Sequence, residues 1–554
     1  MKKLTLICFC CFFGFSPFYG AAQIQESQID FVFKEWNETN VPGGSVGIVK
    51  DGELIFFKGY GLADLEHDIP NTPSTVFYIG SNGKQFAAFC VLLLEEQGKL
   101  KLTDDIRQYL SDFPEYESPI TIENLLYHTS GIRDYSSLWD LQGRSYFDLI
   151  TAAETYEMLK RQSRINFPPG EEVLYSNGGY FLLSEIVQRV AGKSLKDFAK
   201  EHIFDPLGME HTLFLDNHKD LIKNRAFGYY KRADGGFDNA IRRFELVGSG
   251  GVYSTVLDLY KWDQNFYNNK LGEGGQKIIN KLLKVGRLNN GGSTGESAGI
   301  QVDTYKGITE VSHGGSHGGF RTQIMRFPDQ NFSVIVLSNR SDTNYNTKAR
   351  EIADLYLEEH YLSESETRKA KSFLDLKSNK LSKFVGDYID EYSGRVRSIE
   401  MSNDTLFYVR SENRKDKLVP FSQTDFEIVS RGNGQFGIAF EKVEQGRQAF
   451  RFVNDGRKTT LFKRFEPRVY AADELQPFEG NYYSKDLNVT YDIKIQNEEL
   501  TLFINHNKMS TLKPIAKGTF VSSNADFGVF FFADDKKHLK VNASRIKDVE
   551  FERI

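Results

Sequence analysis

The chain of 554 residues has only four cysteines, and three of them lie together near its start. Cys8, Cys10 and Cys11 fall inside the first apolar run, which leaves Cys90 alone in the rest of the chain. A single cysteine cannot form an intrachain disulfide, so packing rather than cross-linking must hold the fold together. Because Cys90 lies in another apolar run, we interpret it as a core residue.

The sequence also lacks a basic block and a metal-binding motif. Its formal net charge is −6, which gives no reason to expect nucleic acid as a partner. His313 and His317 are four residues apart, but they lie among glycines rather than on a helix. No H-E-x-x-H pattern or cysteine–histidine cluster accompanies them, so we do not expect zinc.

Residues 1–22 have the pattern of a secretory signal peptide. Lys2 and Lys3 give the charged start, residues 4–15 the apolar core, and small residues precede Gln23. The apolar run is short for a membrane anchor, and no later run is long enough to span a bilayer. We therefore expect a periplasmic or secreted protein with no stable membrane span after signal cleavage.

Strand patterns at both ends of residues 23–362 bracket a mostly helical middle. Residues 45–61 form two β-rich runs around an Asp-Gly pair, which is typical of a hairpin. Residues 318–340 form two more strands, and helical spacing closes the region at 346–361. The pattern predicts an α+β domain, in which helices flank an antiparallel sheet built from both ends, plus an all-α region.

An internal repeat follows a polar linker at 363–380. A shift of 94 residues (478 − 384) aligns residues 384–426 with 478–520 without a gap. Matched glycines and prolines, which mark turns, make chance a poor explanation. Two copies are too few for a solenoid, so we predict two small all-β, barrel-like domains, at 381–467 and 474–554. The matched pairs are Phe384 and Phe478, Gly386 and Gly480, Tyr388 and Tyr482, Ile399 and Ile493, Asn403 and Asn497, Leu406 and Leu500, Pro420 and Pro514, and Phe426 and Phe520.

The apolar run at 78–100 begins with a serine and a lysine, Ser81 and Lys84. One helical turn apart, they share a helix face. Desolvation and the positive end of the helix disfavour the ammonium form of Lys84, and a neutral amine can take the proton of a serine. The S-x-x-K pattern is common, however, and recurs at Ser544 and Lys547 in a strand-like stretch, so it needs partners.

A first partner is the Y-x-N pattern of Tyr175 and Asn177, which follows Ser81 by 94 residues (175 − 81). A phenol beside an amine can relay a proton to a leaving group, and an asparagine amide can hold a substrate carbonyl. This pattern is also common by itself, since it recurs at Tyr267.

A second partner is the segment that begins with His313, Gly314 and Gly315. Glycines allow a substrate to lie against a strand edge. The backbone N–H of Ser316, paired with that of Ser81, would then hold an oxyanion.

Several other residues invite a functional interpretation that we do not favour. The G-x-S-x-G pattern occurs around Ser45, Ser293 and Ser316, but none lies between a strand and a helix, as a nucleophile elbow requires. For His128 and Asp258 we favour structural roles, as capping or buried hydrogen-bonding groups.

Together, these motifs resemble those of the serine β-lactamase and penicillin-binding-protein superfamily, in its class C-related branch. The resemblance covers about residues 30–360. It implies acyl transfer through the serine, with the lysine as first base, the tyrosine as proton relay, the asparagine and the H-G-G segment as substrate-binding groups, and no metal or organic cofactor. The motifs are Ser81-x-x-Lys84, Tyr175-x-Asn177 and His313-Gly314-Gly315, and similar flanks include LLYHTSGI, FPPGEEVLYSNGGY and GSGGVYSTVLDLYKW.

The third motif departs from the pattern of β-lactamases and carboxypeptidases, which usually have a lysine where this chain has His313. Histidine is charged only part of the time near neutral pH, so we expect an acidic substrate to bind better at pH 6 than at pH 8. Esterases and D-aminopeptidases of the family carry such a histidine, and the D-aminopeptidases resemble this chain in having two C-terminal β-barrels. The resemblance thus implies a serine hydrolase of small amides or esters, with D-amino-acid peptides as candidate substrates.

Alternative functions remain open at this point. They are a β-lactamase, a D-Ala-D-Ala carboxypeptidase, and a non-catalytic protein that binds peptidoglycan fragments or a partner, although intact Ser81, Lys84 and Tyr175 speak against the last. The β domains are either a binding appendage or a cover that narrows the cleft through a loop at 411–417 or 505–510. We expect the cover, in which case truncation after Tyr361 widens the substrate range.

Overall fold

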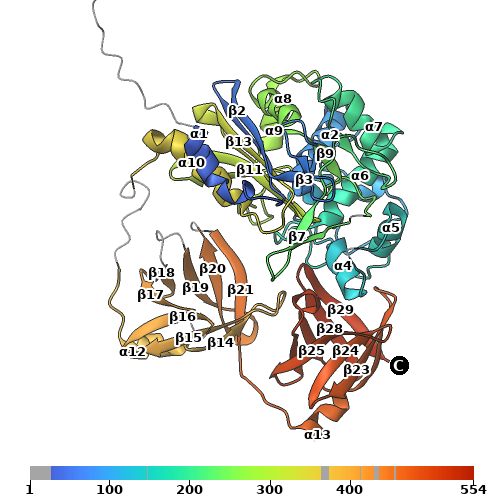
Figure 1. The fold of residues 1–554 in the computed structure, drawn as a ribbon. Helices are drawn as coiled ribbons and strands as arrows, with labels where there is room; N and C mark the ends of the chain where they lie inside the picture. Colours follow the sequence, from blue (N-terminus) through green and yellow to red (C-terminus); the bar gives the residue numbers. More distant parts are fainter. Residues whose placement is uncertain are drawn as a thin grey trace, which may run out of the picture.

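A computed structural model describes seven stretches of the chain (Figure 1), and the expected signal peptide lies outside them. In the part that it describes, no helix combines the length and the apolar character needed to cross a membrane. The described stretches are residues 26–145, 147–241, 243–363, 373–411, 414–429, 436–454 and 457–554.

The predicted α+β domain is confirmed: its centre is an antiparallel sheet of six strands built from both ends of the region. The first strand of the region pairs with the last, so that the two ends of this domain meet inside the sheet. Both of these strands are almost completely buried, because helices cover both faces of the sheet. In spatial order the strands are β10 (Gln301–Tyr305), β11 (Ile308–His317), β12 (Phe320–Phe327), β13 (Phe332–Ser338), β1 (Gly44–Lys50) and β2 (Glu53–Tyr60).

One face of the sheet is covered by α1 (Glu26–Val32) and α10 (Tyr345–Leu357), which share a core with it around Trp36. On the other face, α8 (Val256–Tyr267) packs against β1 and β13. Beyond α8 lies the helical region, centred on α2 (Lys84–Glu96), whose first eleven residues are all buried. The other helices are α3 (Ile122–Leu126), α4 (Tyr135–Leu141), α5 (Ala152–Lys160), α6 (Asn177–Ala191), α7 (Leu195–Ala199) and α9 (Gln276–Leu283), and the short strands are β3 (Leu62–Asp64), β4 (Ile69–Pro70), β5 (Phe77–Tyr78), β6 (Leu213–Phe214), β7 (Tyr229–Lys231), β8 (Phe237–Asn239) and β9 (Val252–Ser254).

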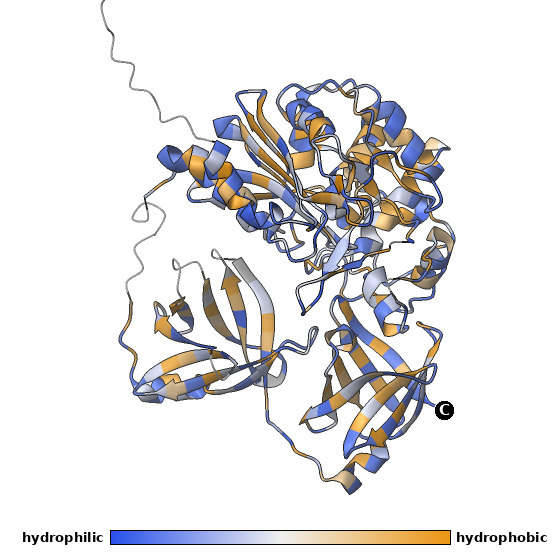
Figure 2. Cartoon of the chain, viewed as in Figure 1, coloured by the Kyte–Doolittle hydropathy of each residue, from blue (hydrophilic) through white to orange (hydrophobic). Residues whose placement is uncertain are grey.

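The two predicted β domains are closed barrels of eight strands, and apolar and polar residues alternate along their strands (Figure 2). The first comprises β14 (Gly386–Ile389), β15 (Val396–Ser402), β16 (Thr405–Ser411), β17 (Arg414–Pro420), β18 (Asp425–Val429), β19 (Phe436–Lys442), β20 (Gln448–Asn454) and β21 (Arg457–Phe465), preceded by α12 (Ser378–Leu381). The second comprises β22 (Gly480–Ser484), β23 (Val489–Gln496), β24 (Glu499–Ile504), β25 (Asn507–Ala516), β26 (Thr519–Ser522), β27 (Val529–Phe532), β28 (His538–Ala543) and β29 (Ile546–Arg553), preceded by α13 (Ala472–Leu475).

The repeat seen in the sequence is reproduced in the atomic detail of the barrels. Gly386 and Gly480 have nearly the same φ, 147° and 149°, in a region that favours glycine. The hydroxyl of Tyr388 donates to a backbone carbonyl four residues earlier, at 2.7 Å, and that of Tyr482 does the same at 3.1 Å. The glycine and the tyrosine therefore match between the two copies because each has the same structural role at the start of both barrels.

The second barrel packs directly on the catalytic domain beneath α4 (Figure 1), and its interior belongs to the same apolar cluster as the helical region. Arg133 and Asp486 form a buried ion pair of 2.8 Å across this contact. The hydroxyl of Tyr491 donates to the carbonyl of Leu141 at 2.7 Å. The first barrel has a core of its own.

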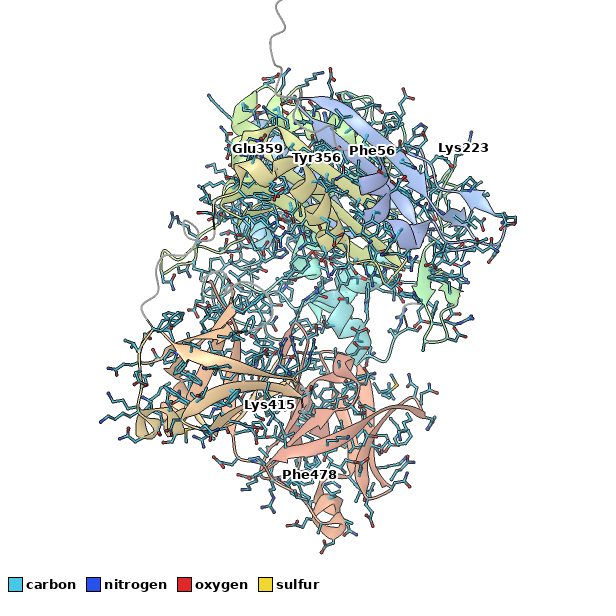
Figure 3. All side chains as sticks on the ribbon, turned by 60° about the vertical axis from the view of Figure 1, so that its left-hand side comes forward. Phe56, Lys223, Tyr356, Glu359, Lys415 and Phe478 are labelled. Carbon is cyan, nitrogen blue, oxygen red and sulfur yellow. The ribbon has the colours of Figure 1, made fainter. Side chains whose placement is uncertain are left out.

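A turn other than the two loops expected from the sequence meets the catalytic domain: residues 543–548, between β28 and β29. In the 411–417 segment, Lys415, which Figure 3 labels on the first barrel, forms an ion pair of 2.6 Å with Glu400 of the same barrel. Residues 412 and 413 lie outside the described residues. Arg133 donates hydrogen bonds to the carbonyls of Lys547 and Asp548 in the turn 543–548, in addition to the contacts made by Asp486 and Tyr491.

Candidate active site

The turn that carries Ser81 is a short 3-10 helix, Gly80–Gly83, which leads into α2. Gly80 has a φ of +58°, and a Cβ on it would lie 2.9 Å from the backbone nitrogen of Ser316. A side chain at this position would thus push β11 away from the serine. The hydroxyl of Thr322 fixes the same turn by donating to the carbonyl of Ile79 at 2.8 Å.

Lys84 is completely buried, and its Nζ contacts three oxygen atoms. These are Ser81 Oγ at 3.2 Å, Asn177 Oδ1 at 2.8 Å and the carbonyl oxygen of Ser249 at 2.5 Å. Burial holds the pKa of Lys84 well below its usual range, and the nearby cation of Arg545 lowers it further. A neutral amine has two N–H donors and one lone pair. The amide and carbonyl oxygens take the donors, which leaves the lone pair for the hydroxyl of Ser81.

Tyr175 is hydrogen-bonded to Ser81, and burial raises the pKa of its hydroxyl, so it remains a phenol. Its ring lies 4.3 Å from that of His128 and 4.8 Å from the Nζ of Lys84. The Nδ1 atom of His128 accepts a hydrogen bond of 3.1 Å from the backbone N–H of Ser176. His128 therefore positions the tyrosine motif, in keeping with the structural role that we favoured.

Asn177 is the first residue of α6, and its backbone N–H donates to Asp134 Oδ2 at 2.7 Å. Its Oδ1 is engaged by Lys84, so its amide N–H groups remain for a substrate carbonyl. Sequence reasoning missed Asp134 and Ser249. The signals were present, since Asp134 caps the N-terminus of α4 and Ser249 lies in the G-S-G-G segment quoted above.

The glycine segment of β11 lies against the serine turn. A Cβ on Gly315 would lie 2.1 Å from the carbonyl oxygen of Ile79, so this close approach requires glycine. Together with the contact at Gly80, it brings the backbone nitrogen of Ser316 close to the turn that carries Ser81. Gly314 is equally constrained, because a Cβ there would meet the ring of Tyr345 at 2.5 Å.

His313 is buried, and its Nδ1 lies 2.7 Å from the carbonyl oxygen of Gly314. Since a carbonyl oxygen only accepts, this nitrogen carries the proton, and Nε2 is left as an acceptor. Burial, together with the nearby Lys84, lowers the pKa of His313 to about 4. The expectation that this residue gains charge between pH 8 and pH 6 is therefore wrong, because burial disfavours the charged imidazolium and Lys84 disfavours it further.

Because His313 is neutral, the preference for an anionic over a neutral substrate should not depend on pH near neutrality. We expect the ratio of kcat/KM for an anionic ester to that for a matched neutral ester to stay constant from pH 8 to pH 6. The histidine gains its proton only as the pH approaches 4, so it adds no charge in this window. Steady-state kinetics of the two esters measures the ratio. A ratio that rises toward pH 6, and no longer rises in His313→Gln, would contradict the buried neutral ring.

The other residues considered in the sequence analysis do not form a second site. Ser45 lies within β1, and its hydroxyl donates to the carbonyl of Thr72 at 2.7 Å. Asp258 accepts from the N–H of His211 at 2.8 Å at the start of α8. Lys547, of the second S-x-x-K pattern, lies over the ring of Tyr392, 5.1 Å from its centre.

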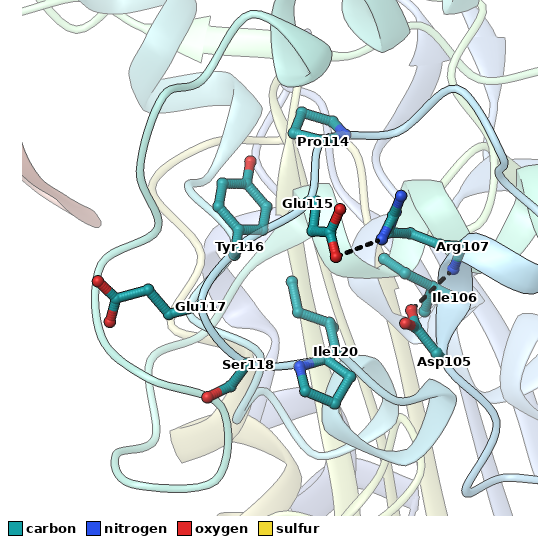
Figure 4. A pocket seen from close by; sticks show the side chains of 10 residues that line it. Asp105, Ile106, Arg107, Pro114, Glu115, Tyr116, Glu117, Ser118 and Ile120 are labelled. Carbon is teal, nitrogen blue, oxygen red and sulfur yellow. Dashed lines mark hydrogen bonds and ion pairs between the residues drawn. The ribbon is translucent and has the colours of Figure 1, made fainter.

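A surface pocket elsewhere is not a second active site (Figure 4). It is formed by the loops around Arg107 and Tyr116, and several of its polar groups are already engaged within the protein. Arg107 pairs with Glu115 at 3.3 Å, and the hydroxyl of Tyr116 donates to a backbone carbonyl. In the described part of the chain, no group of three or more potential metal ligands gathers in one place.

Comparison with known proteins agrees with this arrangement. Residues 29–357 match the family described as Beta-lactamase. A D-aminopeptidase from Brucella anthropi is 29% identical over 520 residues, which cover 93% of this chain and 95% of that protein. An octameric penicillin-binding protein homologue from Pyrococcus abyssi has a similar structure, with a TM-score of 0.54 and 23% identity over 79% of this chain and 99% of that one. The D-amino acid amidase of Ochrobactrum anthropi SV3 aligns with a TM-score of 0.52 and 22% identity over 61% of this chain and 100% of that one.

Proposed function

The chain belongs to the beta-lactamase family and is a serine hydrolase; we propose that it cleaves small amides or esters through an acyl-enzyme on Ser81. Within that class we favour peptides that contain a D-amino acid. The observation that carries the proposal is the buried Lys84, whose lone pair is left for the serine hydroxyl 3.2 Å away.

In the acylation step, Lys84 accepts the proton of Ser81 as the serine oxygen attacks the substrate carbonyl. The backbone N–H groups of Ser81 and Ser316 hold the resulting oxyanion. Tyr175, which remains a phenol, donates its proton to the leaving nitrogen or oxygen and recovers one from the Lys84 ammonium. The products of this step are an ester on Ser81 and a protonated leaving group.

In the deacylation step, water takes the place of the leaving group, and the same relay works in reverse. Tyr175 accepts the proton of the water as it passes its own proton to Lys84, so hydroxide attacks the ester carbonyl. Lys84 then returns a proton to the oxygen of Ser81. Asn177 orients the acyl group through its amide N–H, while Lys84 fixes the amide oxygen at 2.8 Å.

The state of His313 distinguishes this third motif from that of β-lactamases and carboxypeptidases, in which a lysine holds a substrate carboxylate. A neutral ring with only Nε2 available can accept a hydrogen bond but cannot attract a carboxylate as a lysine would. It suits an amide N–H or an amino group. Export through the predicted signal peptide would bring the protein to D-amino-acid peptides of the cell wall, the substrate source that we favour.

Labelling of the nucleophile tests this proposal. We expect a fluorophosphonate to add its mass to the tryptic peptide that contains Ser81, and a fluorescent β-lactam to compete with it. A panel of p-nitrophenyl esters and of D- and L-aminoacyl anilides then defines the acyl group, with the D-anilides hydrolysed faster. If the adduct forms elsewhere, Ser81 is not the nucleophile. If no adduct forms and nothing in the panel turns over, the protein acts instead as a non-catalytic binder of peptidoglycan fragments.

A further inference from the structure

The turn between β28 and β29 is held rigidly against the catalytic domain. Asn166 donates to the carbonyl of Arg545 at 2.9 Å and accepts from the backbone N–H of Lys547 at 2.8 Å. Arg133 donates to the carbonyls of Lys547 and Asp548 at 2.9 and 3.0 Å. With its backbone fixed at Arg545 and over the next three residues, the turn presents this side chain in a defined position.

That position is within the active site. The guanidinium of Arg545 lies 4.9 Å from the centre of the Tyr175 ring. Its Nη1 donates to Asp134 Oδ2 at 3.2 Å, and the same oxygen accepts from the backbone N–H of Asn177 at 2.7 Å. A residue of the second barrel thus contacts the groups that flank the nucleophile.

The ion pair with Asp134 leaves most of the N–H donors of the Arg545 guanidinium without a hydrogen bond to the described residues. Asp134 is fully buried, whereas 37% of the Arg545 side chain is exposed. Of the five N–H groups of an arginine, only one makes a hydrogen bond to the described residues here. The remaining donors form the kind of planar fork that binds a carboxylate well.

The neighbouring basic groups do not compete for this role. Burial lowers the pKa values of Lys84, His128 and His313, which disfavours their charged forms. Burial lowers the pKa of Arg545, but the carboxylate of Asp134 more than offsets this and leaves the pKa above its usual value, so Arg545 keeps its charge. The site therefore has a fixed cation on the barrel side, whereas its own third motif supplies a neutral ring.

We propose that Arg545 is a substrate-binding residue that holds a carboxylate on the leaving-group side of the substrate. The side follows from Tyr175, over which the guanidinium lies and which protonates the leaving group in the proposed mechanism, so the inference rests on the proposed function. The preferred substrates are accordingly small amides or esters whose leaving portion is acidic, such as dipeptides with a free C-terminus.

Two esters that differ only in the leaving group test this assignment. With the acyl group that the panel selects, 3-carboxyphenyl and 3-carbamoylphenyl esters offer leaving groups of similar shape, one anionic and one neutral. The measured quantity is the ratio of their kcat/KM values. We expect Arg545→Gln to lower this ratio about tenfold, the effect of losing one charge-assisted hydrogen bond at a partly exposed site. Arg545→Lys keeps the charge and should keep part of the preference.

Arg321 provides the matched control, because it lies opposite Ser316 in the register of β11 and β12. Arg321→Gln should leave the ratio unchanged. A ratio that is the same in Arg545→Gln and the unaltered protein, even if both activities fall, means that Arg545 only supports Asp134 and overturns the proposal. A ratio that falls in Arg321→Gln instead assigns the carboxylate to the other arginine and also overturns it. Labelling of Ser81 in the unaltered protein separates these results from failure of the proposed function.

Discussion

Replacement of Lys84 by methionine is expected to slow acylation of Ser81 by about 10²- to 10⁴-fold, the range for loss of a positioned general base. Methionine has a similar length and suits a buried site, but it has no nitrogen lone pair to accept the serine proton. The rate of labelling by a fluorophosphonate measures this step directly, since it reports attack by the serine without requiring turnover.

Two controls make this measurement decisive. Ser81→Ala gives the background rate, and thermal unfolding shows whether the variant is folded, because Asn177 Oδ1 and the Ser249 carbonyl both lose a donor in Lys84→Met. If a folded Lys84→Met protein is labelled within about tenfold of the normal rate, another group takes the proton. The phenol of Tyr175 would then be the next candidate, since it is also hydrogen-bonded to Ser81.

The three motifs that meet around the nucleophile could be predicted because each is a short local pattern, whereas Asp134 and Ser249 beside them were missed. Ser81 and Lys84 share one helical turn, and the glycines of the third motif indicate a close approach of backbone to backbone. The barrels were predictable for a similar reason, since the glycine at each barrel start needs the same unusual φ. In both cases the constraint that selects the residue is local in sequence.

Properties that depend on tertiary burial or on domain docking could not be predicted in this way. Nothing near His313 in the sequence indicates that its ring is buried beside Lys84 and stays neutral. Arg545 and Asp134 are 411 residues apart, and their contact exists only because the second barrel docks beneath α4. The turn that carries Arg545 even matched the nucleophile motif, which directed attention to Ser544 and Lys547 rather than to the arginine between them.

The contact between the second barrel and the catalytic domain leads to the second large prediction. We expect Asp486→Asn to lower the free energy of unfolding by about 3 kcal/mol. It removes the negative partner of Arg133, whose side chain is fully buried, and an unpaired buried charge typically costs 3–5 kcal/mol. Asparagine is nearly isosteric and retains an oxygen acceptor, so we expect the lower end of this range. Denaturant unfolding followed by intrinsic fluorescence measures the change.

A matched control comes from the exposed pair of Lys415 and Glu400 on the first barrel, whose side chains are 46% and 48% exposed. Lys415→Gln should change stability by less than about 1 kcal/mol, because water screens both charges. If Asp486→Asn costs no more than this control, the docked arrangement is held by apolar contacts alone, and the ion pair adds little to it.

The same contact decides how removal of the barrels should be interpreted. Arg133 also holds the turn of Arg545 through the carbonyls of Lys547 and Asp548, so Asp486→Asn should loosen the turn as well as the interface. Truncation after Tyr361 removes Asp486, the partner of Arg133, and exposes the apolar surface beneath α4. A wider substrate range in the truncated protein would therefore be the expected result of damage to the site as well as of an open cleft.

Asp486→Asn avoids that ambiguity. A lower preference for the 3-carboxyphenyl ester, with Ser81 still labelled, would show that the docked barrel determines specificity. An unchanged preference in a destabilised variant would mean that Arg545 is held by Asn166 and Asp134 alone.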